Sequence, residues 1–443
     1  MYPNLYYAIN DWFGWKINAL KIFYTFGIFV ALAFIAAAYC LTLELKRKEK
    51  NGLLHPREEG IVVGKPATTF DFILNGLAGF IFGYKLIGVI AASHAQNIDI
   101  QEYIFSSQGS WIGGILIAAL LIYLKFRDKN KQKLATPEKR TIRVWPHDRV
   151  GDMVIYALIF GIIGAKIFDN LENWDRFIKA PLANLLSPSG LTFYGGLICA
   201  AIAILVFAKR KGINLLHLTD AAAPALMIAY AIGRIGCQVA GDGDWGVFNS
   251  AYISDTPGHV VAASPDQYDE QVRKYSTYFL SGEVKDSTGG IITVTDRIAS
   301  SFETIPHKSF KGPSFLPTWL FAYTYPHNVN EDGILLKNCE GKYCRALPQP
   351  VFPTPFYETI ACTLLFLFLW GIRKKITAPG VLFSIYLLLN GIERFLVETI
   401  RVNTTYSIFG IHPTQAEIIS LLLVLSGTIG IIYFGRKKIT TAS

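Results

Sequence analysis

Nine apolar stretches recur along the chain, and several are long enough to cross the hydrocarbon of a lipid bilayer. A helix needs about 20 apolar residues to span roughly 30 Å of hydrocarbon, and the runs 22–43 and 418–434 carry almost no charge. Hydrophobic residues make up 51% of the 443 positions and charged residues only 17%, against about 25% charged residues in a typical soluble domain. This pattern excludes an ordinary cytosolic protein, a disordered chain and a secreted disulfide scaffold. It predicts an all-α polytopic membrane protein.

Basic residues gather in every second loop between the predicted spans, which lie near 18–43, 70–92, 109–126, 151–168, 190–208, 217–239, 356–372, 379–397 and 414–435. The loop at 127–149 is rich in Lys and Arg, for example, whereas 93–108 has neither. Because cytoplasmic loops carry an excess of Lys and Arg, we expect the N-terminus outside and the C-terminus in the cytoplasm. The same bias accounts for the net charge of +9 without a nucleic-acid partner.

The segment 246–352 is too polar to span a bilayer, and this topology predicts that it lies on the outer side. We therefore expect an N-terminal segment with the first span (1–69), a helix pair (70–126), a central membrane core (127–245), an extracytoplasmic segment (246–352) and a C-terminal membrane core (353–443). Two of the six cysteines, Cys339 and Cys344, lie in the outer segment. A disulfide between them and two free thiols are both compatible with that location. The other four cysteines are interpreted as small packing residues.

Two helix pairs resemble each other. Positions 77–87 (LAGFIFGYKLI) and 158–168 (LIFGIIGAKIF) share a Gly-x-Lys signal. The span after each begins with a Gly-Gly pair, Gly113-Gly114 in the first copy and Gly195-Gly196 in the second, which has one extra residue before it. Small-residue patterns recur in any helical bundle, so coincidence is one interpretation and duplication of a two-helix unit is the other. The common order and spacing favour duplication.

Arg234 lies at the outer end of the sixth predicted span, flanked by Gly233 and Gly236 with apolar residues beyond. A charged side chain deep in a bilayer costs about 2.5–3.5 kcal/mol on insertion scales, so it needs a partner or a task. Glycines beside an arginine let another backbone or a lipid head group approach closely. The alternative is a side chain at a helix end that reaches to the interface, and the apolar flanks of Arg234 favour a site.

Arg394, Glu398 and Arg401 stand at the outer end of the eighth span, four and three residues apart, so they share one helix face. Arginine offers a planar fork of donors that suits phosphate, and it does not lose its proton. Two arginines facing one another, Arg234 and Arg394, would form a site for a lipid phosphate, with a glutamate between them to orient the fork. For Arg401 and Glu393, reaching to the interface is an equally good interpretation.

The turn after the sixth span, AGDGDWG at 240–246, holds Asp242 and Asp244. Either could pair with an arginine, or both could lie in a solvated turn. No glutamate follows at the distance that a calcium loop requires. The histidines are scattered and no phosphate-binding loop is present, so no metal, nucleotide or other cofactor is indicated. Glu358 lies in the first turn of the seventh span, where a carboxylate suits a helix N-terminus.

Tyr194 and the pair Gly195-Gly196 mark the outer start of the fifth span. The predicted topology puts side chains from four helices at the same outer level. These are Tyr194, Arg234, Glu358 and Arg394. Their convergence is the main evidence from the residues themselves for a functional site.

These residues are similar to those of the prolipoprotein diacylglyceryl transferases, a family of bacterial inner-membrane enzymes. The strongest match is 233–246 (GRIGCQVAGDGDWG), which resembles the family's signature around its essential arginine. Weaker matches follow the family's order at 189–197, 220–224, 353–358 and 394–398 with Arg401. Tyr24 falls where the family has a tyrosine after a basic residue.

The resemblance implies transfer of the diacylglyceryl group of phosphatidylglycerol to the lipobox cysteine thiol of a preprolipoprotein that still carries its signal peptide. A thioether would form and glycerol phosphate would leave, with Arg234 and Arg394 stabilising the departing phosphate. Tyr194 is the third residue expected in the catalytic group. Residues expected to bind substrate are Tyr24, Gly195, Gly196, Asp242, Tyr357, Glu358, Glu398 and Arg401. The implied partners are phosphatidylglycerol, signal peptides and membrane lipids, and the implied location is the bacterial inner membrane.

Two features depart from the family's pattern. Tyr194 stands where the family commonly has a histidine, which would suit a general base for the thiol at neutral pH. Because a tyrosine has an ordinary pKa near 10, we expect Tyr194 to orient a head group, with the base elsewhere or substrate positioning sufficient. The family typically has seven spans, and 70–126 adds two, an even number that preserves the orientation of the later spans.

Two other functions are compatible with parts of the pattern. Repeated helix pairs and intramembrane arginines also suit a lipid or anion transporter. Against transport, the charges lie toward one face rather than at the midplane, so no path across the membrane is indicated. A relative without catalysis that binds phospholipid or an exported partner is the other alternative.

Overall fold

The computed structural model describes residues 1–95, 103–104, 106–134, 136–187, 190, 192–256, 258–280, 282–285, 291–294, 298–299, 301–337, 339, 341–401 and 413–436. The chain forms two compact units. Unit 1 comprises Met1–Ala8, Phe23–Ala37 and Ala222–Ser443, and unit 2 comprises Ile9–Ile22 and Ala38–Ala221. Each unit is described by itself.

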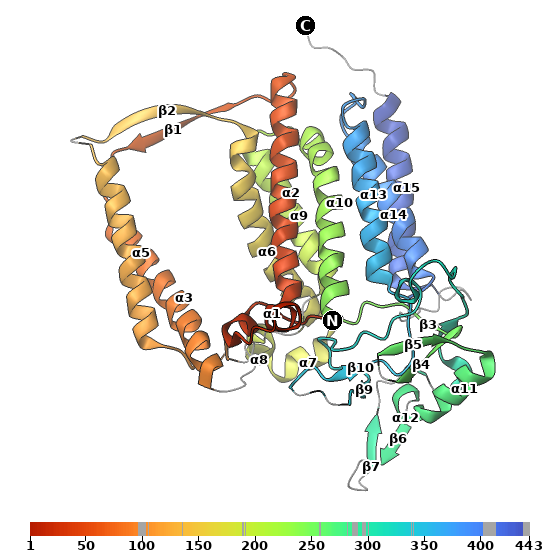
Figure 1. Ribbon diagram of the computed structural model, residues 1–443. Coiled ribbons are helices and arrows are strands. Elements are labelled where there is room, and N and C mark those ends of the chain that lie inside the picture. The colour runs from red at the N-terminus through yellow and green to blue at the C-terminus, as the bar shows by residue number, and fades with distance from the viewer. Residues whose placement is uncertain are drawn as a thin grey trace. The chain divides into compact units, whose positions relative to one another are not determined.

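Nine helices of 18 or more residues occur in the described ranges (Figure 1): α2 (Thr25–Lys50), α3 (Thr69–Ala95), α5 (Trp111–Gln132), α6 (Val150–Glu172), α9 (Phe193–Arg210), α10 (Leu215–Ala240), α13 (Thr354–Ile372), α14 (Val381–Glu398) and α15 (Gln415–Arg436). Seven of them are long and apolar enough to cross a membrane. The other two, α5 and α14, carry at least three charged residues in every 18-residue stretch. The protein is therefore an all-α polytopic membrane protein. The nine spans and the outward N-terminus stay predictions.

The remaining elements are short. In chain order they are α1 (Leu5–Phe13), η1 (Asn18–Ile22), β1 (Arg57–Val63), β2 (Glu138–Val144), η2 (Pro146–Arg149), α7 (Trp174–Lys179), α8 (Pro181–Leu186), β3 (Phe248–Asn249), β4 (Tyr252–Thr256), β5 (His259–Ala262), α11 (Pro265–Lys274), α12 (Ser276–Phe279), β6 (Gly282–Lys285), β7 (Ile291–Val294), η3 (Phe302–Thr304), β8 (His307–Lys308), η4 (Thr318–Leu320), β9 (Ile334–Leu335) and β10 (Arg345–Ala346). Within the described residues the strands form only two-stranded sheets.

Unit 2 contains two helix hairpins, α3 with α5 and α6 with α9. In each hairpin two glycines bring the helix backbones together. A Cβ on Gly113 would lie 2.7 Å from the main-chain oxygen of Gly83, and a Cβ on Gly195 would lie 2.7 Å from that of Gly164. Helices pack this closely only where side chains are absent. The Gly-x-Lys and Gly-Gly signals therefore mark the same helix contact in both hairpins.

The lysines of the two Gly-x-Lys signals make equivalent contacts with main-chain oxygens. Lys85 Nζ donates to the main-chain oxygens of Ser106 (2.5 Å) and Gln108 (2.8 Å) in the connection from α3 to α5. Lys166 Nζ lies 3.4 Å from the main-chain oxygen of Gly190, in the connection from α6 to α9. Each lysine thus holds the loop that closes its own hairpin.

A strand precedes each hairpin, and the two strands pair with each other in antiparallel orientation. Arg57 opens β1 and Glu138 opens β2, 81 positions apart, which is also the separation of the two Gly-x-Lys signals. Gly60 pairs with Thr141, again 81 positions on, so the pairing is symmetric about equivalent residues. These matches support duplication, and they extend the repeated unit from two helices to a strand followed by two helices.

The segment between α10 and α13 forms a small module of short strands and helices in unit 1. Its apolar core includes Phe248, Tyr268, Phe279, Tyr325 and Leu347. Cys339 and Cys344 are joined by a disulfide with an S–S distance of 2.03 Å, so of the two possibilities left open by the sequence the bridge is the one found.

Both ends of this module are held at one place, where α10 has ended and α13 begins. Gly246 N donates to Phe352 O at 2.8 Å, and Phe352 N donates to Val247 O at 3.1 Å. Val247 N donates to Ile400 O at 2.8 Å, which brings the residues after α14 to the same strip. A Cβ on Gly246 would lie 2.6 Å from Ile400 O, so this close approach requires glycine. These hydrogen bonds bring together the end of α10, the start of α13 and the end of α14. Five of the eleven predicted site residues lie on these helices, and Asp242 and Arg401 follow two of them directly.

Candidate active site

Arg234 projects from the last two turns of α10 in unit 1. The neighbouring Gly236 is needed for packing, because a Cβ there would lie 2.9 Å from the Cβ of Phe29 on α2. Gly233, by contrast, borders open space, with no atom within 4 Å of the Cβ position in the described structure. The expectation of close approach beside Arg234 therefore holds on the Gly236 side.

The Arg234 guanidinium is held by two carboxylates and a ring. Its Nε lies 3.0 Å from Glu358 Oε2, and its Nη1 pairs with Asp244 Oδ2. The Tyr230 ring centroid lies 5.4 Å from the guanidinium carbon, within cation–π range. Only 16% of the Arg234 side chain is exposed, so most of its charge is balanced inside the protein.

Glu358 is the centre of the cluster, and its side chain is fully buried. The residue lies in the second turn of α13, after Thr354 and Pro355 begin the helix. Its Oε1 accepts a hydrogen bond from Tyr230 OH at 2.9 Å and lies 3.4 Å from Arg394 Nη1. A buried carboxylate is costly unless it is paired and hydrogen-bonded. Oε1 has both kinds of contact, whereas Oε2 has the ion pair with Arg234 but no hydrogen bond among the described residues.

The charges at the end of α14 complete the cluster. Arg394 Nη2 lies 2.8 Å from Glu398 Oε2, as their spacing of four residues predicts. Thr414 Oγ1 donates to the other Glu398 oxygen at 2.7 Å. Arg401, just after the helix, binds Asp244 Oδ1 through Nη2 at 2.5 Å. We call this set the arginine cluster: Arg234, Arg394, Arg401, Asp244, Glu358 and Glu398.

The arginine cluster carries three positive and three negative groups, so it is balanced without a ligand. One N–H donor of the cluster has no hydrogen-bond acceptor among the described residues. Arg401 Nη1 is buried 3.8 Å from Glu358 Oε1, beyond hydrogen-bond range, and has no other acceptor among the described residues. Asp244 is the most exposed acid, with 35% of its side chain accessible, whereas Glu358 and Glu398 are enclosed. An incoming anion would therefore displace Asp244 more readily than either glutamate.

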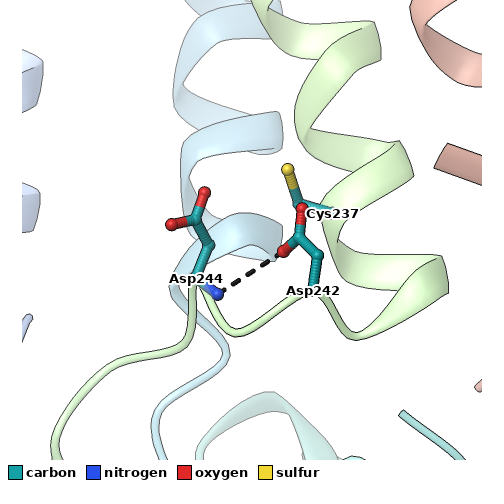
Figure 2. Close-up of side chains that lie close together, drawn as sticks. All are labelled: Cys237, Asp242 and Asp244. Atoms are coloured by element: carbon teal, nitrogen blue, oxygen red, sulfur yellow. Dashed lines mark hydrogen bonds between the residues drawn. The ribbon is translucent and has the colours of Figure 1, made fainter. Parts of the chain in front are cut away.

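The turn after α10 holds two aspartates in different electrostatic states. Figure 2 shows Asp242 and Asp244 beside Cys237, with the main-chain N–H of Asp244 donating to Asp242 Oδ1 at 3.4 Å. Burial raises the pKa of Asp242. Burial would also raise the pKa of Asp244, but the charges of Arg234 and Arg401 outweigh it and lower that pKa. Of the two aspartates, Asp244 is thus the one that pairs with arginines.

One ligand atom from each of these three residues lies within 4.8 Å of the others, a spacing that a metal ion could use. Both carboxylate oxygens of Asp244 already contact arginines. A cation at this point would also face two guanidinium groups at close range, which is electrostatically unfavourable. The arrangement therefore favours an anion over a metal ion.

Other predicted residues of unit 1 lie outside the arginine cluster. Tyr357 OH donates to the main-chain oxygen of Leu320 at 2.5 Å, which ties α13 to the small module between α10 and α13. Tyr24 forms a main-chain bridge with Asn4 just before α2 begins. Substrate binding by Tyr24, Tyr357 and Asp242 stays a prediction.

Tyr194, Gly195 and Gly196 belong to unit 2. Both glycines serve the α6–α9 contact, since a Cβ on Gly196 would lie 2.9 Å from the main-chain oxygen of Gly161. The Tyr194 ring meets that of Phe193 edge-on at 5.8 Å. A role for these three residues at the site stays a prediction.

Sequence reasoning missed Tyr230, which contacts both Arg234 and Glu358. Tyr230 precedes Arg234 by four residues in a helix, so the two share a face. That spacing was the available signal.

Together the fold and the site define a polytopic helical membrane protein with a buried arginine–carboxylate cluster at the ends of three of its long helices. Residues 133–433 match the family described as prolipoprotein diacylglyceryl transferase. The match covers more than half of the 443 residues, and the chain belongs to this family. The matched segment contains the whole arginine cluster, whereas Tyr24 and the first hairpin precede it.

Individual relatives carry the name phosphatidylglycerol–prolipoprotein diacylglyceryl transferase. The one from Shouchella clausii is 24% identical over 282 residues, which is 63% of this chain and 73% of the relative. The one from Dehalococcoides mccartyi is 25% identical over 292 residues, or 66% of this chain and 79% of the relative. The one from Leptospira interrogans is 33% identical over 124 residues, or 23% of this chain and 39% of the relative.

Proposed function

We propose that this chain transfers the diacylglyceryl group of phosphatidylglycerol to the lipobox cysteine thiol of a preprolipoprotein. The observation that carries the proposal is the arginine cluster, which lies inside the segment that matches the transferase family. The cysteine sulfur bonds to the terminal glycerol carbon of the diacylglyceryl group. The bond from that carbon to the phosphate oxygen breaks, and glycerol phosphate departs.

The departing phosphate gains negative charge as the carbon–oxygen bond breaks. Guanidinium groups held in place before the reaction stabilise such charge without reorganising. Arg234 and Arg394 are both fixed by Glu358, at 3.0 and 3.4 Å, so their orientation is set in advance. Glu358 and Glu398 thus act as positioning residues, and the two arginines contact the phosphate.

Asp244 engages two guanidinium groups that a bound phosphate would take over, and Arg394 is the further arginine proposed to contact that phosphate. Asp244 joins Arg234 and Arg401 across the partly exposed side of the cluster. A phosphodiester offers the same two-point geometry to guanidinium groups. Binding of phosphatidylglycerol would free Asp244 from one or both arginines and would give Arg401 Nη1 an acceptor.

The attacking sulfur must lose its proton, because the thiolate is the nucleophile. The departing phosphate is one destination for that proton, and it needs no further residue. Tyr194 is proposed to orient a head group, because phenols are in general poor bases at neutral pH. No cofactor is required by these steps.

The cluster lies at one end of each helix that supplies it, near the end of α10, the start of α13 and the end of α14. A transport path would need charges near the midplane, so this placement favours an enzyme. We propose that this end is the outer face of the bacterial inner membrane, where signal peptides of exported lipoproteins are presented. The partners are phosphatidylglycerol, preprolipoprotein signal peptides and membrane lipids.

The test is a direct assay with purified protein, phosphatidylglycerol and a lipobox peptide. Mass spectrometry should find the peptide heavier by one diacylglyceryl group. Arg234→Ala should lower the rate at least 10²-fold, the order of magnitude for loss of one charge-stabilising donor. The matched control is Lys85→Ala, which removes a cation from the first hairpin and should keep the activity.

Two results would overturn the proposal. Near-normal activity in Arg234→Ala would show that the arginine cluster is not the site. Absence of product from the unaltered protein, where a histidine-bearing relative is active, would reject the transferase. Retention of phosphatidylglycerol in that case would identify a lipid-binding protein instead.

A further inference from the structure

A groove of about 720 Å³ lies in unit 2 where α9 ends beside β1. One wall is apolar and is built from α6 and α9, including Tyr156, Phe160, Ile202 and Val206. These side chains are 37–56% exposed, which in a membrane-spanning helix pair means that they face lipid. The volume is within the range of about 300–1,000 Å³ that is typical of ligand sites.

The rim of the groove is basic. Arg57 comes from β1, and Arg210 and Lys211 come from the end of α9. Arg57 Nη1 donates to the main-chain oxygen of Arg210 at 2.8 Å, which fixes one guanidinium over the end of the helix. Among the described residues neither Arg57 nor Arg210 has a carboxylate partner.

The nearby acids are already engaged. Glu59 Oε1 lies 2.5 Å from Arg149 Nη2 and 3.1 Å from Lys211 Nζ. Hydrogen bonds from Arg149 and Lys211 lower the pKa of Glu59 to about 2, so it stays ionised. Asp152 lies 3.9 Å from Arg149. The charged residues that line the groove are three cations, Arg57, Arg210 and Lys211, and one carboxylate, Glu59, which leaves a net charge of +2 at its mouth.

We propose that this groove binds one anionic phospholipid, with an acyl chain along α6 and α9 and the phosphate at Arg57, Arg210 and Lys211. An apolar wall that ends in unpaired guanidinium groups matches an acyl chain that ends in a phosphate. The phosphate position is distinct from the proposed reaction, because the basic rim lies at the end of α9 and Tyr194 lies at its start. Under the predicted topology it faces the cytoplasmic leaflet.

The internal repeat supplies a built-in comparison. Arg57 in the first copy corresponds to Glu138 in the second, 81 positions on. After the extra residue that precedes Gly195-Gly196 the separation is 82, so Arg210 in the second copy corresponds to Asp128 in the first. Two of the rim cations are thus replaced by acids at the equivalent place near α5. The same fold unit should therefore bind an anionic lipid at α6–α9 and not at α3–α5.

The experiment is photocrosslinking of the whole protein in lipid nanodiscs. The probe is a phosphatidylglycerol with a diazirine in one acyl chain, and a matched phosphatidylcholine serves as the zwitterionic probe. Labelled peptides are identified by mass spectrometry. We expect the anionic probe to label α6 and α9 near Tyr156 and Ile202, and to label α3 and α5 no more than the zwitterionic probe does.

The double variant Arg57→Gln/Arg210→Gln should reduce labelling of α9 by the anionic probe roughly tenfold, since each basic residue near a membrane surface contributes substantially to anionic-lipid binding. The matched control, Lys139→Gln/Arg140→Gln, removes the same charge from the paired strand and should label normally. Equal labelling of α9 by both probes would overturn the proposal, as would an unchanged double variant. Loss of labelling in excess inorganic phosphate alone would assign the rim to free anions and would also overturn it. Transfer activity is not the readout, so failure here leaves the proposed reaction untouched.

Discussion

Asp242 and Asp244 are two residues apart and respond to pH in opposite ways. The pKa of Asp244 is lowered in the folded protein, so this group stabilises the fold above its ordinary pKa of 3.8, and that contribution is lost as pH falls through the lowered value. The pKa of Asp242 is raised, so its contribution is complete below 3.8 and is lost as pH rises through the raised value.

At pH 7 we therefore expect Asp244→Asn to lower the midpoint of thermal unfolding, because it leaves Arg234 and Arg401 without their shared carboxylate. The loss should be on the order of 1–3 kcal/mol. Asp242→Asn should leave the midpoint unchanged or raise it, since burial disfavours the charged form of Asp242 and the amide is neutral. Thermal unfolding in detergent between pH 3.5 and 8 measures both. The assignment fails if the two variants behave alike.

Substitutions of Tyr194 test whether its hydroxyl takes part in proton transfer. If the residue only orients a head group, Tyr194→Phe should keep most of the turnover and change mainly KM. Tyr194→His should introduce a group with an ordinary pKa near 6.5 and move the pH–rate profile toward lower pH. A loss of about 10²-fold or more in kcat with Phe would instead identify the hydroxyl as a proton donor or acceptor.

The sequence identifies the charged residues of the site better than their pairing. The sequence alone predicts the ion pair between Arg394 and Glu398, because helical spacing fixes the distance between them. The choice between Asp242 and Asp244 depends on how the turn after α10 folds back to Arg401, which is a contact across 157 positions. Local spacing carries no information about such a contact.

At the scale of helices, the glycines of α6 differ in what they contact. Gly164→Ala should weaken the α6–α9 hairpin, because its Cβ would lie 2.5 Å from the main-chain oxygen of Gly195. Overpacking of this kind costs about 1–3 kcal/mol. Gly151→Ala is the matched control in the same helix, where no described atom lies within 4 Å, and it should be neutral or stabilising by about 0.5–1 kcal/mol. Unfolding midpoints of the two variants measure the difference, and equal midpoints would contradict the close glycine contact.

The nine long helices of the described residues lie at the nine apolar stretches, because long hydrophobic segments are the strongest signal in such a sequence. The β1–β2 ribbon could not be predicted in the same way. Six of the seven residues in β2 are exposed, and the strand has no buried face to impose an alternating pattern. Only its pairing with β1 reveals it as part of the repeat.

For the whole molecule, the predicted topology can be tested by accessibility. Nine spans with an outward N-terminus place the loop containing Lys179 outside and the loop containing Lys374 in the cytoplasm. In intact spheroplasts, a membrane-impermeant maleimide should label Lys179→Cys, and it should label Lys374→Cys only after lysis. The reverse pattern would invert the topology and would move the arginine cluster to the cytoplasmic face.

The module between α10 and α13 begins and ends at neighbouring residues, since Gly246 and Phe352 are joined by a main-chain hydrogen bond of 2.8 Å. A loop whose two ends meet can change length at small entropic cost, about 0.6 kcal/mol for each doubling. Natural insertions, deletions or a grafted domain between these two anchors would then leave the spacing of the helix ends intact. The segment between these two anchors is therefore free to vary in length without moving the arginine cluster.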